Sequence, residues 1–83
     1  MNSVTMTDGV YYRCSVGDLV KSTYSDRNIE MYAKAFAFEL EDVSGHLVPN
    51  EPAVVLEVGM RFIRVINTRG EIGWLVYYNL VPF

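Results

Sequence analysis

A chain of 83 residues can form one small domain, because a chain of this size buries too little surface to support two separate cores. Hydrophobic residues make up 51% of it, which excludes an intrinsically disordered protein. The 7 basic and 10 acidic residues give a net charge of -3, which disfavours nucleic-acid binding because that binding depends on Lys and Arg.

The first quarter of the chain carries short strand signals behind a polar start. Residues 1–9 are expected to be a flexible N-terminal tail, so that the folded domain spans 10–83. Residues 10–16 and 19–24 are rich in β-branched and aromatic side chains, which predicts two strands separated by a Gly17-Asp18 turn. Because no apolar run reaches about 18 residues and no signal peptide is recognisable, we expect a cytoplasmic protein without a membrane partner.

Residues 25–43 fit two structures. Apolar residues at helical spacing predict one inserted helix around residues 26–42, capped by Ser25 or Asp26. These residues are Ile29, Tyr32, Ala33, Phe36, Ala37, Leu40 and Val43. The alternation of Phe36, Phe38 and Leu40 instead predicts a strand that leads into a turn at 42–45. A helix would cover one end of the β domain, whereas a hairpin would extend its sheet; the helix is the preferred interpretation, and the sequence alone leaves both open.

The last thirty residues give the clearest fold signal. Residues 44–52 are predicted to be a loop, because prolines 49 and 52 forbid a helix. Beyond them, three β-branched and aromatic runs are separated by Val58-Gly59-Met60 and by residues 67–70, which is typical of a meander of antiparallel hairpins. Both faces of these runs are partly apolar. We therefore predict a mainly β fold, a small β-barrel with residues 25–52 as an insertion.

The segment Gly70-Glu-Ile-Gly-Trp-Leu-Val-Tyr-Tyr-Asn-Leu-Val81 resembles the closing part of a Src-homology-3-like barrel. In that family a hairpin glycine, a second glycine, an apolar strand, a three-ten turn and a short last strand follow in this order. Val16-Gly-Asp-Leu-Val20 is similar to the family's first strand, and the matching stretches cover roughly half of the chain. Two departures are the insertion at 25–52 and Val76, which stands where peptide-binding members have proline. The resemblance therefore implies the fold but not recognition of proline-rich peptides.

The same motifs, together with Val55-Leu-Glu-Val-Gly59, resemble small uncharacterised proteins of tailed phages, particularly those of marine cyanobacteria. This resemblance implies a phage-encoded protein that acts in the host cytoplasm. A host protein is then one candidate partner.

No residue pattern in the sequence is typical of catalysis. His46 is the only histidine, and it is expected to be a solvated residue of the Gly-Pro loop. Cys14 lies within an apolar run and is expected to be a small core residue; as the only cysteine, it cannot form an intramolecular disulfide. No acidic or histidine pair has a recognised metal-ligand spacing. We therefore expect no enzyme, no catalytic residue, no metal and no cofactor.

Aromatic residues give the first functional hypothesis. Six tyrosines and one tryptophan exceed what so small a core can hold with every hydroxyl satisfied, so either they form a tyrosine-rich core rim or some of them bind a partner. We expect a non-catalytic adaptor in which Trp74, Tyr77 and Tyr78 contact a protein near the three-ten turn. Arg69 or Glu71 would set its orientation. Self-association through a strand edge is a variant of this hypothesis.

Basic residues give an alternative of a different class. Arg61, Arg64 and Arg69 lie on one predicted hairpin with Phe62, and single-stranded nucleic-acid binders combine cations with aromatic rings in this way. The hypothesis requires the three arginines to share one exposed face. It fails if they are scattered or paired with Glu57 and Glu71.

Overall fold

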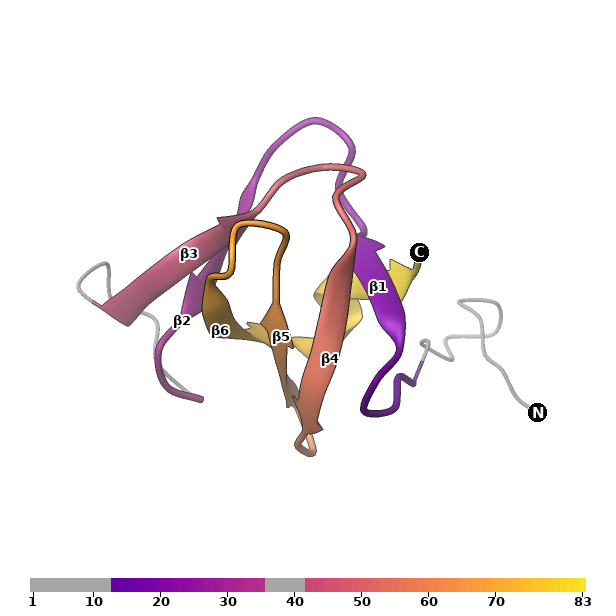
Figure 1. Cartoon of the computed structure of the whole chain (residues 1–83), viewed down its shortest axis with the longest axis vertical. Coiled ribbons are helices and arrows are strands. Elements are labelled where there is room, and N and C mark those ends of the chain that lie inside the picture. Colours follow the sequence, from indigo (N-terminus) through magenta and orange to yellow (C-terminus); the bar gives the residue numbers. More distant parts are fainter. Residues whose placement is uncertain (1–12, 36–41) are drawn as a thin grey trace.

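The computed structural model describes residues 13–35 and 42–83, which form a curled antiparallel sheet (Figure 1). The described residues contain seven strands that pair in the order β3-β2-β6-β5-β4-β1-β7. They are β1 (Leu19–Ser22), β2 (Ile29–Tyr32), β3 (Val43–Leu47), β4 (Ala53–Val58), β5 (Phe62–Ile66), β6 (Ile72–Val76) and β7 (Leu80–Pro82). A three-ten turn, Tyr77–Asn79, joins β6 to β7. The prediction of a mainly β, barrel-like domain is confirmed, and the sheet curls into a half-barrel.

The meander at the centre of the sheet forms where the sequence predicts it. β4, β5 and β6 pair consecutively, and the Asn67–Gly70 turn joins the last two strands (Figure 1). Asn67 forms this turn with its side chain, because its Oδ1 accepts the main-chain N–H groups of Arg69 and Glu71, both at 3.0 Å. Gly70 has φ 82°, a left-handed conformation that favours glycine. This hairpin is therefore specified by its own residues.

The core lies on the concave side of the curled sheet. Every strand contributes at least one fully or almost fully buried apolar side chain to it. These residues are Val20, Met31, Leu47, Ala53, Val55, Ile63, Val65, Leu75 and Leu80. Because the contributors come from all seven strands, the core depends on the complete sheet and no single hairpin can form it alone.

The helix predicted around residues 26–42 is not confirmed. Ile29–Tyr32 forms strand β2, which pairs with β3, and residues 36–41 lie outside the described part of the chain. The sheet is extended here by a β2–β3 hairpin. The strand that the alternative predicted through Phe36, Phe38 and Leu40 lies outside the described residues. The glycine at position 73 lets β2 approach β6 closely, because a Cβ added at Gly73 would lie 2.5 Å from the Cβ of Met31. A local helical pattern carries no information on this distant contact.

Three further expectations need correction. The turn at 42–45 and the loop at 44–52 are wrong over Val43–Leu47, which forms β3 and buries Leu47. The strand at 10–16 is not seen at residues 13–16, and its first residues, like the tail 1–9, lie outside the described ranges. The Gly17-Asp18 turn is present, with the Asp18 N–H donating to the Ser15 carbonyl at 3.0 Å.

The first and last strands complete the sheet. β1 pairs with β4 on one side and with β7 on the other, so the last strand lies beside the first (Figure 1). The three-ten turn and short last strand implied by the Src-homology-3-like resemblance are both present. No helix within 13–35 or 42–83 is long and apolar enough to cross a membrane.

Candidate ligand groove

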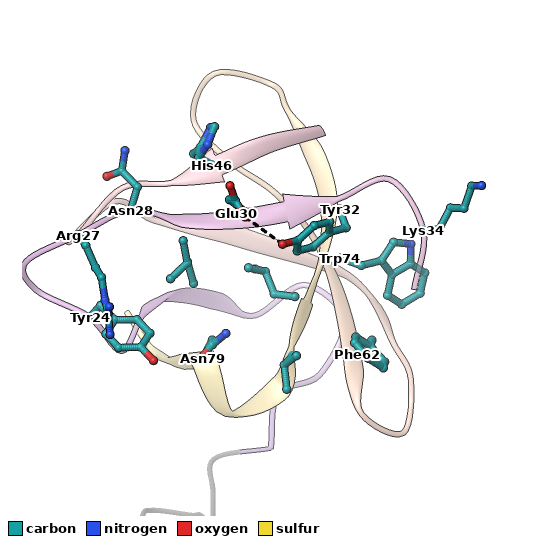
Figure 2. A pocket seen from close by; sticks show the side chains of 13 residues that line it. Tyr24, Arg27, Asn28, Glu30, Tyr32, Lys34, His46, Phe62, Trp74 and Asn79 are labelled. Atoms are coloured by element: carbon teal, nitrogen blue, oxygen red, sulfur yellow. Dashed lines mark hydrogen bonds between the residues drawn. The ribbon is translucent and has the colours of Figure 1, made fainter. Parts of the chain in front are cut away.

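A groove opens where β2 separates from β6. These strands pair only at Tyr32 and Trp74, and beyond this point the gap between them widens toward the three-ten turn. The groove has a volume of about 650 Å³, within the range of roughly 300–1,000 Å³ that is usual for ligand sites. Its walls are formed by Tyr24, Arg27, Asn28, Ile29, Glu30, Tyr32, Lys34, His46, Phe62, Trp74, Leu75, Val76 and Asn79 (Figure 2).

Aromatic rings stand at both ends of the groove. At one end the guanidinium of Arg27 lies 4.3 Å from the centre of the Tyr24 ring (Figure 2). At the other end Trp74 and Phe62 lie together, and the Arg64 guanidinium is 5.9 Å from the Trp74 ring centre. Rings of this kind offer large apolar contact areas to a ligand, and Tyr and Trp add a polar group at the edge.

The upper wall of the groove carries a polar pair on β2. The Tyr32 hydroxyl donates a hydrogen bond of 2.9 Å to Oε1 of Glu30, two residues earlier on β2 (Figure 2). This bond, followed by burial, raises the pKa of Tyr32 above its ordinary value. The pair keeps the Tyr32 ring in place along the wall, because residues i and i+2 of a strand lie on the same face.

The charge of the groove differs from that of the whole chain. Arg27 and Lys34 lie at opposite ends, and Glu30 lies between them as the only carboxylate among the described lining residues. The groove therefore has a formal excess of one positive charge, although the chain carries -3. Neither Arg27 nor Lys34 takes part in a salt bridge within the described residues.

A second, smaller hollow continues this surface. It has a volume of about 340 Å³ and is lined by Arg61, Phe62, Val76, Tyr77 and Tyr78. The rings of Tyr77 and Tyr78 meet edge to face, with their centres 5.4 Å apart. Because Phe62 and Val76 line both depressions, Trp74 and the two tyrosines belong to one continuous surface. Tyr78 is half exposed on it.

Arg69 and Glu71, which the sequence suggested as orienting residues, lie in a different region. They belong to a turn network that also contains Glu51, Asn67 and Thr68, and neither lines the groove or the hollow. Arg69 contacts the Glu51 carboxylate at 2.9 Å and the Glu71 carboxylate at 3.4 Å. The structure thus brings Trp74, Tyr77 and Tyr78 together and places the other two residues elsewhere.

Glu51 is the buried centre of the turn network. Its side chain is only 8% exposed, and it accepts hydrogen bonds from Thr68, from the Val48 N–H at 3.0 Å and from Arg69. Burial acts to raise the pKa of Glu51, but the hydrogen bonds from Thr68 and Val48 and the charge of Arg69 outweigh it and hold the pKa below its ordinary value.

Glu71 connects the same network to β3. It accepts hydrogen bonds from the Asn67 side chain at 2.8 Å and from the His46 N–H at 3.3 Å, which together lower the pKa of Glu71. The His46 carbonyl accepts a bond from Asn67 at 2.8 Å. Side chains therefore occupy the outer edge of β3 at this position, where an open edge would otherwise invite another strand.

The arginines of the alternative hypothesis are divided between these regions. Arg64 is paired with Glu57 at 3.0 Å, and Arg69 is paired with Glu51 and Glu71. Arg61 lines the smaller hollow, as does Phe62, which is largely buried. Pairing with Glu57 and Glu71 counts against a nucleic-acid surface built from these three arginines.

Sequence reasoning missed the N-terminal half of the groove. Tyr24, Arg27, Glu30, Tyr32 and Lys34 lie in or beside the stretch that was predicted to be a helix. An available signal was the Glu30-Met31-Tyr32 alternation, which in a strand puts Met31 in the core and its two neighbours outside.

Cys14 packs against the core, and burial raises the pKa of its thiol, as expected for a small core residue.

Comparison of the chain with protein-family models, with curated proteins and with solved structures gives no match. The groove and its surroundings are therefore the basis for proposing a function.

Proposed function

We propose that this chain is a non-catalytic protein-interaction module, built on a Src-homology-3-like barrel, that binds a protein partner along the groove and the adjoining hollow. The observation that supports it most is the continuity of Trp74, Tyr77 and Tyr78 with a groove of about 650 Å³. Trp and Tyr are the residues most often responsible for binding energy at protein interfaces. A phage origin belongs to this proposal through sequence resemblance alone.

Strand order supports the barrel assignment within the proposal. A three-stranded meander is followed by a three-ten turn and by a last strand that pairs with the first, and the β2–β3 hairpin occupies the connection between β1 and the meander. In this arrangement the groove lies between the hairpin and the three-ten turn. Arg69 and Glu71 bond to His46 of the hairpin from the turn network and lie outside the groove and the hollow.

The test is selection of short random peptides on the immobilised full chain, followed by binding measurements with fluorescence anisotropy. We expect Trp74→Ala to weaken the selected peptides by roughly tenfold or more, since Trp at an interface is commonly worth over about 2 kcal/mol. Tyr78→Ala, at a more exposed position, should weaken them less. Met60→Ala is the matched control, because Met60 is 94% exposed and lines neither the groove nor the hollow.

Two results would reject the proposal. One is the absence of any enriched peptide. The other is enrichment of peptides that bind wild type, Trp74→Ala and Met60→Ala equally while all three proteins show the same far-ultraviolet circular dichroism.

A further inference from the structure

The main chain on both sides of the groove faces into it. In an antiparallel pair, opposed residues alternate between those that exchange hydrogen bonds and those whose N–H and C=O point away from each other. His46 is opposite Glu30, but its N–H and C=O bond to the side chains of Glu71 and Asn67 on its other side. The N–H and C=O of Glu30 must then also point away from β3, toward the groove.

The same reasoning applies to β6. The Tyr77 N–H donates to the Arg61 carbonyl at 2.9 Å, so the preceding residue, Val76, is opposite Phe62 in a pair that does not exchange hydrogen bonds. The Val76 N–H therefore points away from β5. Because the pairing of β2 with β6 stops at Tyr32 and Trp74, Val76 and Glu30 face each other across the groove that separates them.

We propose that the groove binds an acidic peptide segment in extended conformation, which takes main-chain hydrogen bonds from Glu30 and Val76 and places carboxylates against Arg27 and Lys34. This inference rests on the proposed function and specifies the chemistry of the partner. Addition of an extended segment to an open strand edge is a general mode of peptide recognition.

The charges of the groove fix where the acidic side chains lie. Arg27 stacks on Tyr24, which orders its guanidinium and leaves the in-plane N–H groups for a carboxylate. Lys34 supplies a second cation at the other end of the groove (Figure 2). Glu30, between them, repels a third negative charge, so the acidic residues of the segment are expected at its two ends and neutral residues at its centre.

Single-stranded nucleic acid fits these features less well. Its phosphate backbone only accepts hydrogen bonds and so cannot pair with the Glu30 carbonyl as a peptide main chain can, and its evenly spaced charges would pass beside the Glu30 carboxylate. A peptide offers both donors and acceptors along its main chain. The observations therefore favour the peptide, and an oligonucleotide becomes a competitor in the test.

The test begins with the peptide most enriched on the full chain and an analogue in which each Asp and Glu is replaced by Asn and Gln. We expect the analogue to bind wild type roughly tenfold more weakly, because hydrogen bonds between charged groups are about twice as strong as neutral ones. In the double variant Arg27→Gln, Lys34→Gln the two peptides should bind alike. Lys21→Gln, a cation on β1 outside the groove, is the control and should retain the full difference.

A second measurement tests the main-chain contacts. Amide hydrogen exchange, followed by nuclear magnetic resonance, should slow at Glu30 and Val76 by roughly tenfold or more on saturation with the peptide, as expected for newly bonded amides. Unchanged exchange at both positions would overturn the extended mode of binding.

Other outcomes separate this inference from the proposed function. If the selected peptides are neutral but lose affinity in Trp74→Ala, the inference fails and the proposed function stands. If no peptide is selected, both fail. If single-stranded oligothymidylate displaces the acidic peptide and binds more tightly, the peptide assignment is wrong.

Discussion

The turn network and the groove lie on neighbouring parts of one small sheet, and they differ in whether their charged side chains are paired within the chain. In the network Arg69 binds both Glu51 and Glu71, and the two carboxylates also accept hydrogen bonds from main-chain N–H groups and from the side chains of Thr68 and Asn67. In the groove Arg27 and Lys34 lack a carboxylate partner within the described residues. The first arrangement stabilises the fold, while the second leaves charge available to a ligand.

This comparison explains why residue type alone does not identify a site. Arg69 and Glu71 are a charged pair beside a glycine turn, and in the sequence they are as suggestive as Arg27 and Lys34. What separates them is whether the fold provides an internal partner. Substitutions in the network should therefore change stability, and substitutions in the groove should change binding.

The largest expected effect on stability is at Gly73, where β2 packs closely against β6 between the two regions. A Cβ at this position would lie 2.5 Å from both the Met31 Cβ and the Ser44 Oγ, and 3.2 Å from the Met31 main chain. Gly73→Ala should lower the free energy of unfolding by about 3 kcal/mol, the upper part of the range for overpacking a core. Chemical denaturation measures this loss, and a decrease below about 0.5 kcal/mol would show that the β2–β3 hairpin is not held as described.

The second effect is at Glu51. Glu51→Ala removes a buried carboxylate that accepts part-buried hydrogen bonds from the Val48 N–H and the Thr68 hydroxyl and pairs with Arg69, so we expect a loss of about 1–2 kcal/mol. Glu57→Ala is the matched control, because it breaks the exposed pair with Arg64, which should cost under about 1 kcal/mol. Equal losses in the two variants, measured by urea denaturation, would contradict the buried role of Glu51.

The sequence predicts some parts of both the network and the groove and does not predict others. The meander, the Asn67–Gly70 turn and the aromatic cluster at Trp74 follow from local patterns, because alternation, turn residues and the family-like closing segment all lie within one stretch. Strand β2 could not be found in this way. β2 is stabilised by its pairing with β3 and by the close approach to β6 that the missing side chain of Gly73 allows, over forty residues later in the chain. The local residues of β2 also suit a helix.

The partners of Arg69 were hidden for the same reason. Glu51 lies on a turn before β4, eighteen residues from Arg69, and only the fold brings them together. A charge next to a turn glycine could equally have been an orienting residue at an interface. Long-range polar pairing is the part of a site that a single sequence does not reveal.

The third prediction concerns acid. The pKa values of Glu51 and Glu71 are lowered in the folded chain, so their contribution to stability is present above the ordinary glutamate pKa of about 4.3 and is lost as the pH falls through the folded values. The unfolding free energy should therefore decrease as the pH is lowered below about 4.3. Glu51→Gln should be less stable than wild type at neutral pH, and this difference should shrink in acid. A difference that stays constant from neutral pH to acid would show that the charge of Glu51 has no role.

The smallest expected effects are those of the groove cations on stability. Lys34→Gln should change the free energy of unfolding by less than about 0.5 kcal/mol, as is usual for a surface substitution. Arg27→Gln removes the contact with the Tyr24 ring, so it should cost at most about 1 kcal/mol. Thermal and urea denaturation of the two variants measure both values. If either variant lost as much stability as Glu51→Ala, that cation would be serving the fold as Arg69 does, and the contrast between a satisfied network and an open groove would not hold.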